Sequence, residues 1–229
     1  MCHKFFMFGL HALRYMHKHG IGHCSAIMPT MLEQRILQQF IDSADLKYQA
    51  APTLSKPLAA AAQAVLACVT GGGKVLACGN GGSAADAQHF CAEFVGRFER
   101  ERPELGAIAL TTDSSILTAV ANDYHFDQVF ARQVRALGQP GDVLLAISTS
   151  GNSPNVLKAI EAAHEREMVV IGLSGRGGGA MATQLRDTDV HVCVPHDRTA
   201  RIQEVHILAL HCLCAAVDTE LLGEPESPT

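Results

Sequence analysis

The sequence predicts an α/β fold, a doubly wound parallel sheet of five strands flanked by helices. Short apolar runs alternate with segments of helical periodicity, a pattern typical of consecutive βαβ units. The apolar runs are residues 74–78, 106–110, 142–147, 168–173 and 189–194. Two of the runs end in turns rich in Gly, Asn and Ser, and open parallel sheets bind their ligands at such strand ends.

Helices are predicted between the strands and at both ends of the chain. Apolar residues at helical spacing indicate one helix over 32–48 and another over 57–69. The helical segments between the strands are 83–100, 114–135, 154–166 and 177–186. A closing helix is expected over 199–222, because Gly223 and Pro225 follow it.

The two helices before the first strand have no partner in a doubly wound sheet. Each carries an apolar stripe that has to be covered. We expect this N-terminal helical preface to serve in oligomerisation, and we predict a homotetramer. Packing of the two helices back onto the same subunit is the alternative.

Length and composition fit one globular domain, which we place at residues 31–223. The net charge of −5, without clustered Lys and Arg, argues against direct nucleic acid binding. We expect no membrane span, because no apolar run approaches the roughly eighteen residues it needs. The eight cysteines include no Cys-x-x-Cys pair, so we expect reduced thiols and a cytoplasmic location.

The two ends of the chain differ in character from the rest. Residues 1–30 contain five of the twelve histidines, and Met28 and Met31 stand just before the first amphipathic segment. We interpret residues 1–30 as a non-native or disordered extension that arises from an upstream start codon. A signal peptide fits poorly, because charged and histidine residues interrupt the apolar run. Residues 224–229 are expected to be a disordered tail.

Two loops have the composition of phosphate-binding turns. Gly79-Asn80-Gly81-Gly82-Ser83 follows the first predicted strand, and Ser148-Thr149-Ser150-Gly151-Asn152-Ser153 follows the third. Small residues let the backbone approach an anion, and the helix that follows offers unpaired N–H groups. Neither loop matches the dinucleotide or P-loop signatures, which makes a nucleotide the weaker hypothesis. Together they favour a sugar phosphate over two ordinary strand-to-helix turns.

Four residues on two helices could form a metal site. His89 and Glu93 are four positions apart, so they share one helix face. Gln203 and His211 fall about 80° apart around the last helix. Two imidazoles and a carboxylate are typical zinc ligands, with the Gln amide as an unusual fourth. Ordinary core histidines are the alternative, and spacing alone does not exclude them.

These motifs, together with Asn122-Asp123 and Arg201-Ile202-Gln203-Glu204, resemble the sugar isomerase (SIS) family. The resemblance covers about residues 31–222 and is nearest to the phosphoheptose isomerase branch. That branch converts sedoheptulose 7-phosphate to D-glycero-D-manno-heptose 7-phosphate for heptose biosynthesis. The resemblance implies the SIS fold, which is flavodoxin-like, and aldose–ketose isomerisation through an enediol.

The resemblance also implies roles for individual residues. The implied catalytic pair is Glu93 and His211, and the implied cofactor is one zinc ion per subunit, either catalytic or structural. Its implied ligands are His89, Glu93, Gln203 and His211. The implied substrate-binding residues are Asn80, Gly81, Gly82, Ser83, Glu93, Asn122, Asp123, Ser148, Thr149, Ser150, Ser153 and Gln203.

A second branch of the family is the alternative. The DnaA initiator-associating factor DiaA shares this fold as a tetramer and binds the replication initiator DnaA without isomerase activity. Segments 135–138, 141–149, 199–204 and 212–214 of this chain resemble that branch as well. The acid–base pair is typically replaced there, whereas Glu93 and His211 are both present here, and this favours the enzyme.

Overall fold

The structure is a computed structural model that describes residues 30–224. The chain divides between Ile41 and Asp42 into two compact units, and the sheet lies in the second unit. The predictions for the N-terminal extension and the C-terminal tail concern residues outside the described range, apart from Thr30 and Glu224.

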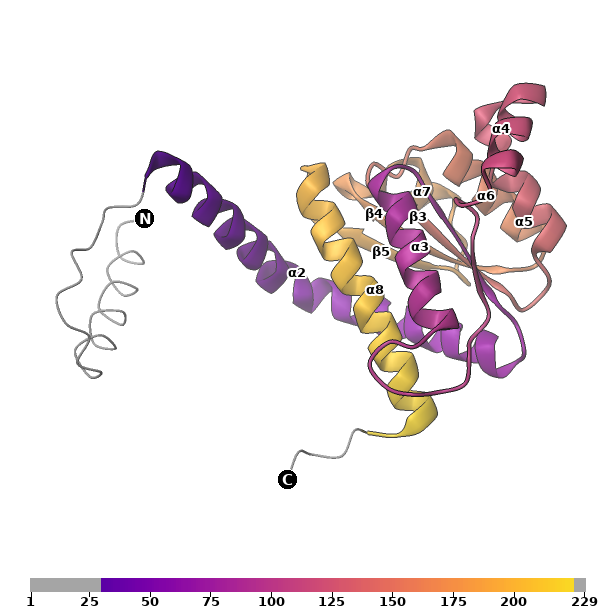
Figure 1. The fold of residues 1–229 in the computed structure, drawn as a ribbon, viewed down its shortest axis with the longest axis horizontal. Helices are drawn as coiled ribbons and strands as arrows, with labels where there is room; N and C mark the ends of the chain where they lie inside the picture. Colours follow the sequence, from indigo (N-terminus) through magenta and orange to yellow (C-terminus); the bar gives the residue numbers. More distant parts are fainter. Residues whose placement is uncertain (1–29, 225–229) are drawn as a thin grey trace. The chain divides into compact units, whose positions relative to one another are not determined.

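Five parallel strands form one sheet in the order β2-β1-β3-β4-β5. The strands are β1 (Val75–Gly79), β2 (Ala107–Ala109), β3 (Val143–Ser148), β4 (Val169–Gly175) and β5 (Val190–Val194). This is the flavodoxin-like order, in which the direction of winding reverses between β1 and β3. The predicted fold class is confirmed (Figure 1), and each strand lies within two residues of its predicted bounds.

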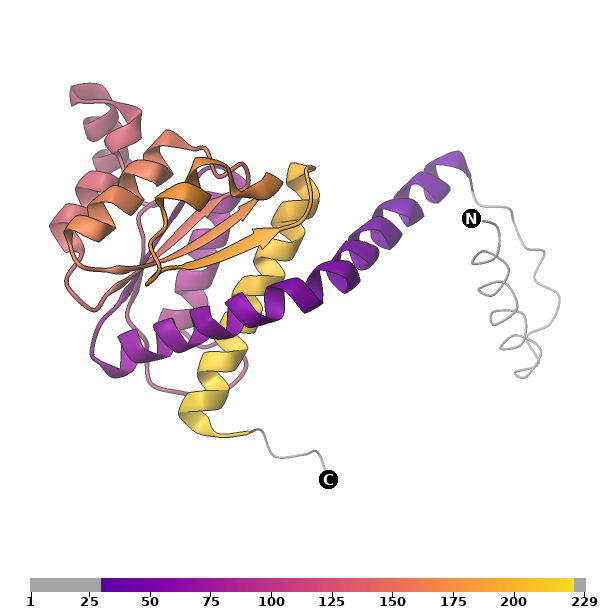
Figure 2. The ribbon, with the colours of Figure 1, turned by 180° about the vertical axis from the view of Figure 1, so that it is seen from behind.

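Helices cover both faces of the sheet. They are α3 (Gly82–Val95), α4 (Ser114–Asp123), α5 (Ala131–Leu137), α6 (Pro154–Glu165), α7 (Gly179–Gln184) and α8 (Thr199–Leu222), with 3-10 turns η1 (Phe126–Gln128) and η2 (Arg176–Gly178). Helices α3 and α8 lie on one face and α5 and α6 on the other (Figures 1 and 2). Val75 and Ala77 of β1 pack with α3 and α8, whereas Leu76 and Cys78 pack with α5 and α6. Successive strand residues point to opposite faces, so one strand supplies both cores.

One helix, α2 (Met31–Thr70), replaces the two helices predicted before the sheet. The prediction of a break over 49–56 was wrong, although Pro52 and Pro57 lie inside the helix and each lacks an N–H group. Leu54, between the prolines, is buried in the core that α3 and α8 share. Tertiary packing of this kind outweighs the local cost of proline.

Three helix bounds also differ from the prediction. The segment 114–135 is not one helix: α4 ends at Asp123, and η1 separates it from α5. The helix predicted over 83–100 ends at Val95, before Gly96. The helix predicted over 177–186 begins two residues later, because Gly177 and Gly178 have positive φ angles that interrupt a helix.

The expectation that no segment is long and apolar enough for a membrane span was wrong for two helices. By length and composition alone, α2 and α8 meet that criterion. In α8, residues including Ile202, Leu210 and Leu213 are buried in the core of this unit. The core helices of globular proteins have the same length and composition, so the criterion does not indicate a membrane segment here.

Two histidines meet at Ser174 of β4, inside the domain. Ser174 Oγ lies 2.6 Å from His191 Nε2, and the Ser174 carbonyl oxygen lies 3.0 Å from His206 Nε2. Burial lowers the pKa of both imidazoles, because their charged forms lose hydration. His206 Nδ1 has no hydrogen-bond partner among the described residues, so a proton there would remain unpaired.

We therefore expect the free energy of unfolding to decrease as the pH is lowered below 6.5, the ordinary pKa of an imidazole. Above that pH both rings are neutral in the folded and unfolded chain. Below it, the unfolded chain binds protons that the folded chain excludes, which favours unfolding. His206→Gln retains an N–H group for the Ser174 carbonyl and removes one titrating group, so it should flatten this dependence. Thermal melts across this pH range check it, and an equal loss of stability in variant and parent would contradict it.

Candidate active site

The first loop follows β1 and leads directly into α3. Gly81 has a φ of 56°, which glycine adopts without the steric cost that a side chain brings. Gly79 lies so close to Ser83 that a Cβ on it would collide with the Ser83 backbone. No side-chain hydrogen bond caps α3 at Gly81. The Ser83 and Ala84 N–H groups bond to the carbonyls of Asn80 and Gly81, and the partial positive charge of this helix end faces the first loop, where an anion would be stabilised.

The second loop, Ser148–Ser153, follows β3 and leads into α6. Ser148 is buried, and its Oγ lies 2.9 Å from Ser153 Oγ. Ser153 occupies the N-cap position of α6 but makes no capping hydrogen bond there. Ser150 Oγ accepts a hydrogen bond of 3.1 Å from the Asn152 N–H group. The loop thus places hydroxyl groups around an uncapped helix N-terminus, an arrangement suited to phosphate.

The glycine-rich segment 175–181 packs against the second loop and is hydrogen-bonded to it. Three hydrogen bonds join them: Gly175 N–H to the Thr149 carbonyl (3.1 Å), Met181 N–H to the Gly151 carbonyl (2.9 Å) and Ala180 N–H to Asn152 Oδ1 (2.8 Å). A side chain on Gly151 would collide with the Gly178 carbonyl. The two backbones approach this closely because position 151 has no Cβ.

A reciprocal amide pair connects the two loops. Asn80 Nδ2 donates to Asn155 Oδ1, and Asn155 Nδ2 donates to Asn80 Oδ1, both at 2.8 Å. Asn155 lies on the first turn of α6 and is buried. A hollow of about 300 Å³ opens beside the pair and is lined by Asn80, Phe126, Asp127, Ser153, Pro154 and Asn155. The pair therefore fixes the Asn80 amide at the edge of this hollow.

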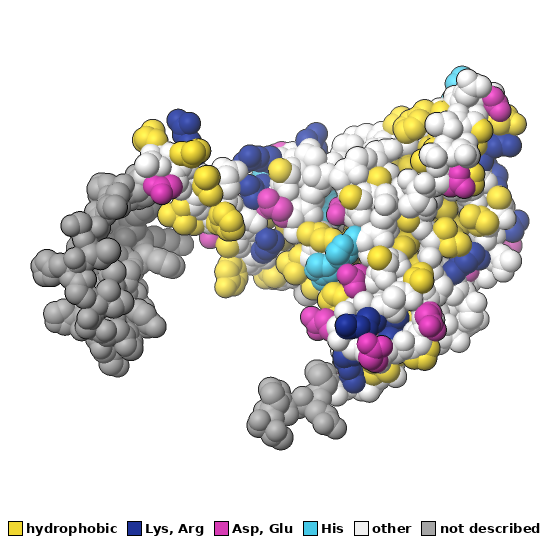
Figure 3. Space-filling view, in the orientation of Figure 1, with side chains coloured by type: hydrophobic (Ala, Val, Ile, Leu, Met, Phe, Trp, Pro, Cys, Tyr) yellow, Lys and Arg dark blue, Asp and Glu magenta, His cyan; other side chains and the backbone are white. Residues whose placement is uncertain are grey.

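His89, Glu93 and His211 come together from α3 and α8. The Nε2 atoms of His89 and His211 lie 3.0 Å apart, and His89 Nε2 lies 3.2 Å from Glu93 Oε1. One potential ligand atom from each residue lies within 4.8 Å of the others. Figure 3 shows histidine and acidic side chains side by side on this face. Two imidazoles and a carboxylate at this spacing fit the ligand set of a zinc ion.

Gln203 lies at the other end of the interface between α3 and α8. Its amide occupies the space that a side chain on Gly82 would fill. Eight residues, about 12 Å along a helix, separate it from His211. The structure therefore brings Gln203 to the first loop and not into the group of three ligands, and its role as a fourth ligand stays a prediction.

Asn122 and Asp123 lie on the last turn of α4, where both are exposed. Asn122 Nδ2 donates to Asp123 Oδ1 at 2.8 Å. Among the described residues, no hydrogen bond joins either side chain to the two loops. Their contact with sugar hydroxyls stays a prediction.

Two residues at the site are absent from the predicted set. Asn155 escapes sequence analysis because its partner, Asn80, is 75 residues away and no local motif links the two. Asp86 lies one turn before His89, and its buried Oδ2 has no hydrogen-bond partner within the described range of the chain. Burial raises the pKa of the Asp86 carboxyl, and the nearby His89 opposes this in part. The three-residue spacing of Asp86 and His89, which places both on one helix face, is the sequence pattern that could have identified Asp86 as a site residue.

A family model described as the SIS domain matches residues 39–175. The chain belongs to the SIS family. Among its curated relatives, the phosphoheptose isomerase of Methylibium petroleiphilum is 71% identical over 196 residues, which are 86% of this chain and 98% of that protein. The phosphoheptose isomerase of Azoarcus sp. is 64% identical over 195 residues, 85% of this chain and 99% of that protein.

Solved structures of the family share the fold. Phosphoheptose isomerase GmhA from Neisseria gonorrhoeae matches with a TM-score of 0.79 and 56% identity, over 82% of this chain and 100% of that chain. A phosphoheptose isomerase from Francisella tularensis matches with a TM-score of 0.80 and 48% identity, over 83% and 100% of the two chains. The predicted membership of the SIS family and of its phosphoheptose isomerase branch is confirmed.

We expect Asn155→Ala to weaken phosphate binding by about tenfold, because Asn80 loses a partner and its amide is no longer held. Titration with inorganic phosphate checks this, with Asn80→Ala and the double variant completing a mutant cycle. If Asn155 acts through Asn80, the double variant should bind no more weakly than Asn80→Ala. Additive losses in the double variant would contradict the coupling.

Proposed function

We infer that the protein is a phosphoheptose isomerase that converts D-sedoheptulose 7-phosphate to D-glycero-D-manno-heptose 7-phosphate, a step in heptose biosynthesis. One observation carries this: α3 begins at a phosphate-type loop and brings Glu93 against the imidazole pair two to three turns further on. A phosphate-binding loop and an acid–base residue on one helix suit a substrate that carries its anionic group at one end and its reactive carbons at the other. The relatives named above support the same assignment.

The two loops would bind the phosphate. The hydroxyl groups of Ser148, Ser150 and Ser153 and the open N-termini of α3 and α6 supply donors and positive partial charge without a full cationic charge. Seven residues, about 10 Å of helix, separate Gly82 from His89, so an extended sugar chain could run from one group to the other. Asn122 and Asp123 would contact its hydroxyls if α4 approaches the bound sugar.

Glu93 and His211 would move the protons. The Glu93 carboxylate takes a proton from C1 of the ketose, and the C1–H electron pair forms the C1=C2 bond of an enediol. His211 transfers a hydroxyl proton from O1 to O2, and the protonated Glu93 returns its proton to C2, which leaves the C1 aldehyde. General acid–base catalysis of this kind contributes about 10²–10⁴-fold in rate.

His89, Glu93 and His211 would hold a zinc ion, whereas Gln203, the fourth ligand that the sequence predicts, lies beside Gly82 and outside this group. Zinc supplies Lewis-acid polarisation of substrate oxygens when it is bound. The donor set fits, since imidazole nitrogen and carboxylate oxygen are ordinary zinc ligands. His89 would then orient the site and take no part in proton transfer.

The alternative role in initiator binding gains no support from the relatives named above. A scaffold has no need for a carboxylate and a second imidazole that both lie within hydrogen-bond distance of His89. We propose a cytoplasmic location, in line with the free thiols of the six described cysteines.

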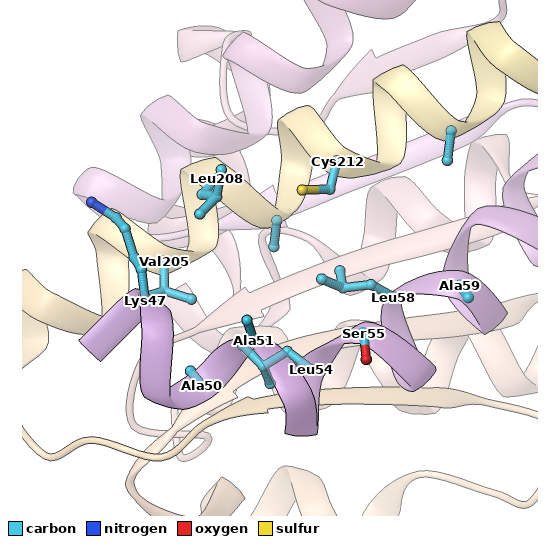
Figure 4. Close-up of a pocket in the computed structure, with 12 residues that line it drawn as sticks. Lys47, Ala50, Ala51, Leu54, Ser55, Leu58, Ala59, Val205, Leu208 and Cys212 are labelled. Atoms are coloured by element: carbon cyan, nitrogen blue, oxygen red, sulfur yellow. The ribbon is translucent and has the colours of Figure 1, made fainter. Parts of the chain in front are cut away.

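We propose that the chain assembles as a homotetramer through two apolar surfaces. The first is the start of α2, where Leu32, Ile36, Leu37 and Phe40 are exposed. The second is a groove of about 340 Å³ between α2 and α8 (Figure 4), whose lining includes Leu54, Leu58 and Leu208. Exposed apolar surfaces of this kind are typical of subunit interfaces.

Turnover of sedoheptulose 7-phosphate, coupled to the next heptose kinase step with and without added zinc, tests the assignment. We expect Glu93→Gln to lose about 10²–10⁴-fold in turnover, because the amide cannot accept the carbon-bound proton. Its fold should be retained. The control is Glu161→Gln on α6, which removes only an exposed pair with Lys158 and should behave as the parent. Full activity in Glu93→Gln would contradict the mechanism.

We expect Phe40→Glu to lower the molar mass measured by light scattering, because a buried carboxylate at a subunit interface is costly. Arg35→Glu, on the polar face of the same helix, is the matched control and should leave the mass unchanged. A parent protein that is already monomeric would overturn the assembly.

A further inference from the structure

Arg102 lies in the loop between α3 and β2, and its side chain is only 1% exposed. Its Nε donates to Asp218 Oδ1 at 2.6 Å. Its Nη2 donates to the Glu93 carbonyl at 2.6 Å, and its Nη1 donates to the carbonyls of Phe94 (2.9 Å) and Pro103 (3.2 Å). Each nitrogen of one buried guanidinium is therefore engaged.

Two of these bonds serve the C-terminus of α3. The last carbonyls of a helix lack intrahelical donors and carry negative partial charge, which a cation stabilises. The last turn of α3 contains no basic residue of its own. Arg102, from outside the helix, supplies donors to Glu93 and Phe94, and so it fixes the backbone of the proposed base.

The third bond ties the same guanidinium to α8. Asp218 follows His211 by seven residues, or about two turns, so both lie on the face of α8 that meets α3. Asp218 is buried, and the structure places its Oδ1 on Arg102. One side chain thus bonds to the backbone of Glu93 and to the helix that carries His211.

Stability alone is a weak explanation for this pair. A buried ion pair is often no more stabilising than apolar residues of the same volume, because both charges lose hydration. Asp218 Oδ2, moreover, has no hydrogen-bond partner among the described residues. The planar guanidinium instead holds three groups in a defined geometry: the Glu93 carbonyl, the Phe94 carbonyl and the Asp218 carboxylate.

We propose that Arg102 is a positioning residue that sets the separation of α3 and α8, and through it the placement of Glu93 against His211. This deepens the proposed isomerase function and rests on it. Arg102 does not touch the substrate, and its effect passes through the Glu93 carbonyl on one side and Asp218 on the other.

The test compares Arg102→Lys with Arg100→Lys in the full chain. Lysine at 102 can pair with Asp218 but cannot reach both carbonyls of α3, so we expect kcat to fall about 10- to 100-fold with KM within about twofold, since small misplacements cost this much. Among the described residues, Arg100, two residues earlier, bonds to the carbonyls of Leu222, the last residue of α8, and Gly223, which follows it. Its lysine variant should match the parent.

Hydrogen–deuterium exchange gives a readout that needs no activity. Amides 93–96 at the end of α3 should exchange faster in Arg102→Lys than in Arg100→Lys, because the Glu93 and Phe94 carbonyls lose the guanidinium donors and Phe94 keeps only the Leu105 N–H group among its described partners. Should Arg102→Lys fail to fold, Asp218→Asn keeps the shape and loses the charge, and it should lower kcat in the same direction.

Unchanged kcat in a folded Arg102→Lys, even with a lower melting temperature, would overturn the positioning role. Parent protein without heptose phosphate turnover would refute the proposed function instead. In that case the exchange of amides 93–96 still decides whether Arg102 fixes the end of α3.

Discussion

The packing of α3 against α8 is the constraint on which the candidate site depends. The two helices are more than a hundred residues apart in the chain, and only their contact brings His89 within 3.0 Å of His211. Apolar residues of both helices, Phe90 and Phe94 with Ile202 and Leu210, belong to one buried cluster. The burial that folds the domain therefore also sets the geometry of the site.

The parallel sheet supplies the second half of the site. Because β1 and β3 are neighbours and run in the same direction, their carboxyl ends place both loops at one edge. Close backbone approach at Gly79 and Gly151 then shapes loops that contain no cationic side chain. Such a site depends on helix N-termini and on the hydroxyl groups of serine side chains in place of a full cationic charge.

Much of this was predictable from the sequence, and the exceptions have physical causes. The strands and α8 follow from hydrophobic periodicity, and His89 with Glu93 from four-residue spacing. The unbroken α2 could not be predicted, because the packing of Leu54 and its neighbours outweighs the cost of two prolines. The Asn80–Asn155 pair could not be predicted either, since a contact between residues 75 positions apart leaves no local sequence pattern. The place of Gln203 beside Gly82 required the spacing of two helices.

The amide pair has a consequence for which part of a ligand Asn80 can meet. A primary amide has two N–H donors and two acceptor lone pairs, and Asn155 uses one of each. Asn80 retains one donor and one acceptor, which point to opposite edges of its amide, away from the edge that Asn155 occupies. One ligand oxygen can therefore meet only one of them. The pair thus limits what Asn80 can offer a phosphate to a single N–H donor, and it leaves the remaining lone pair for a group that carries a hydrogen, such as a sugar hydroxyl.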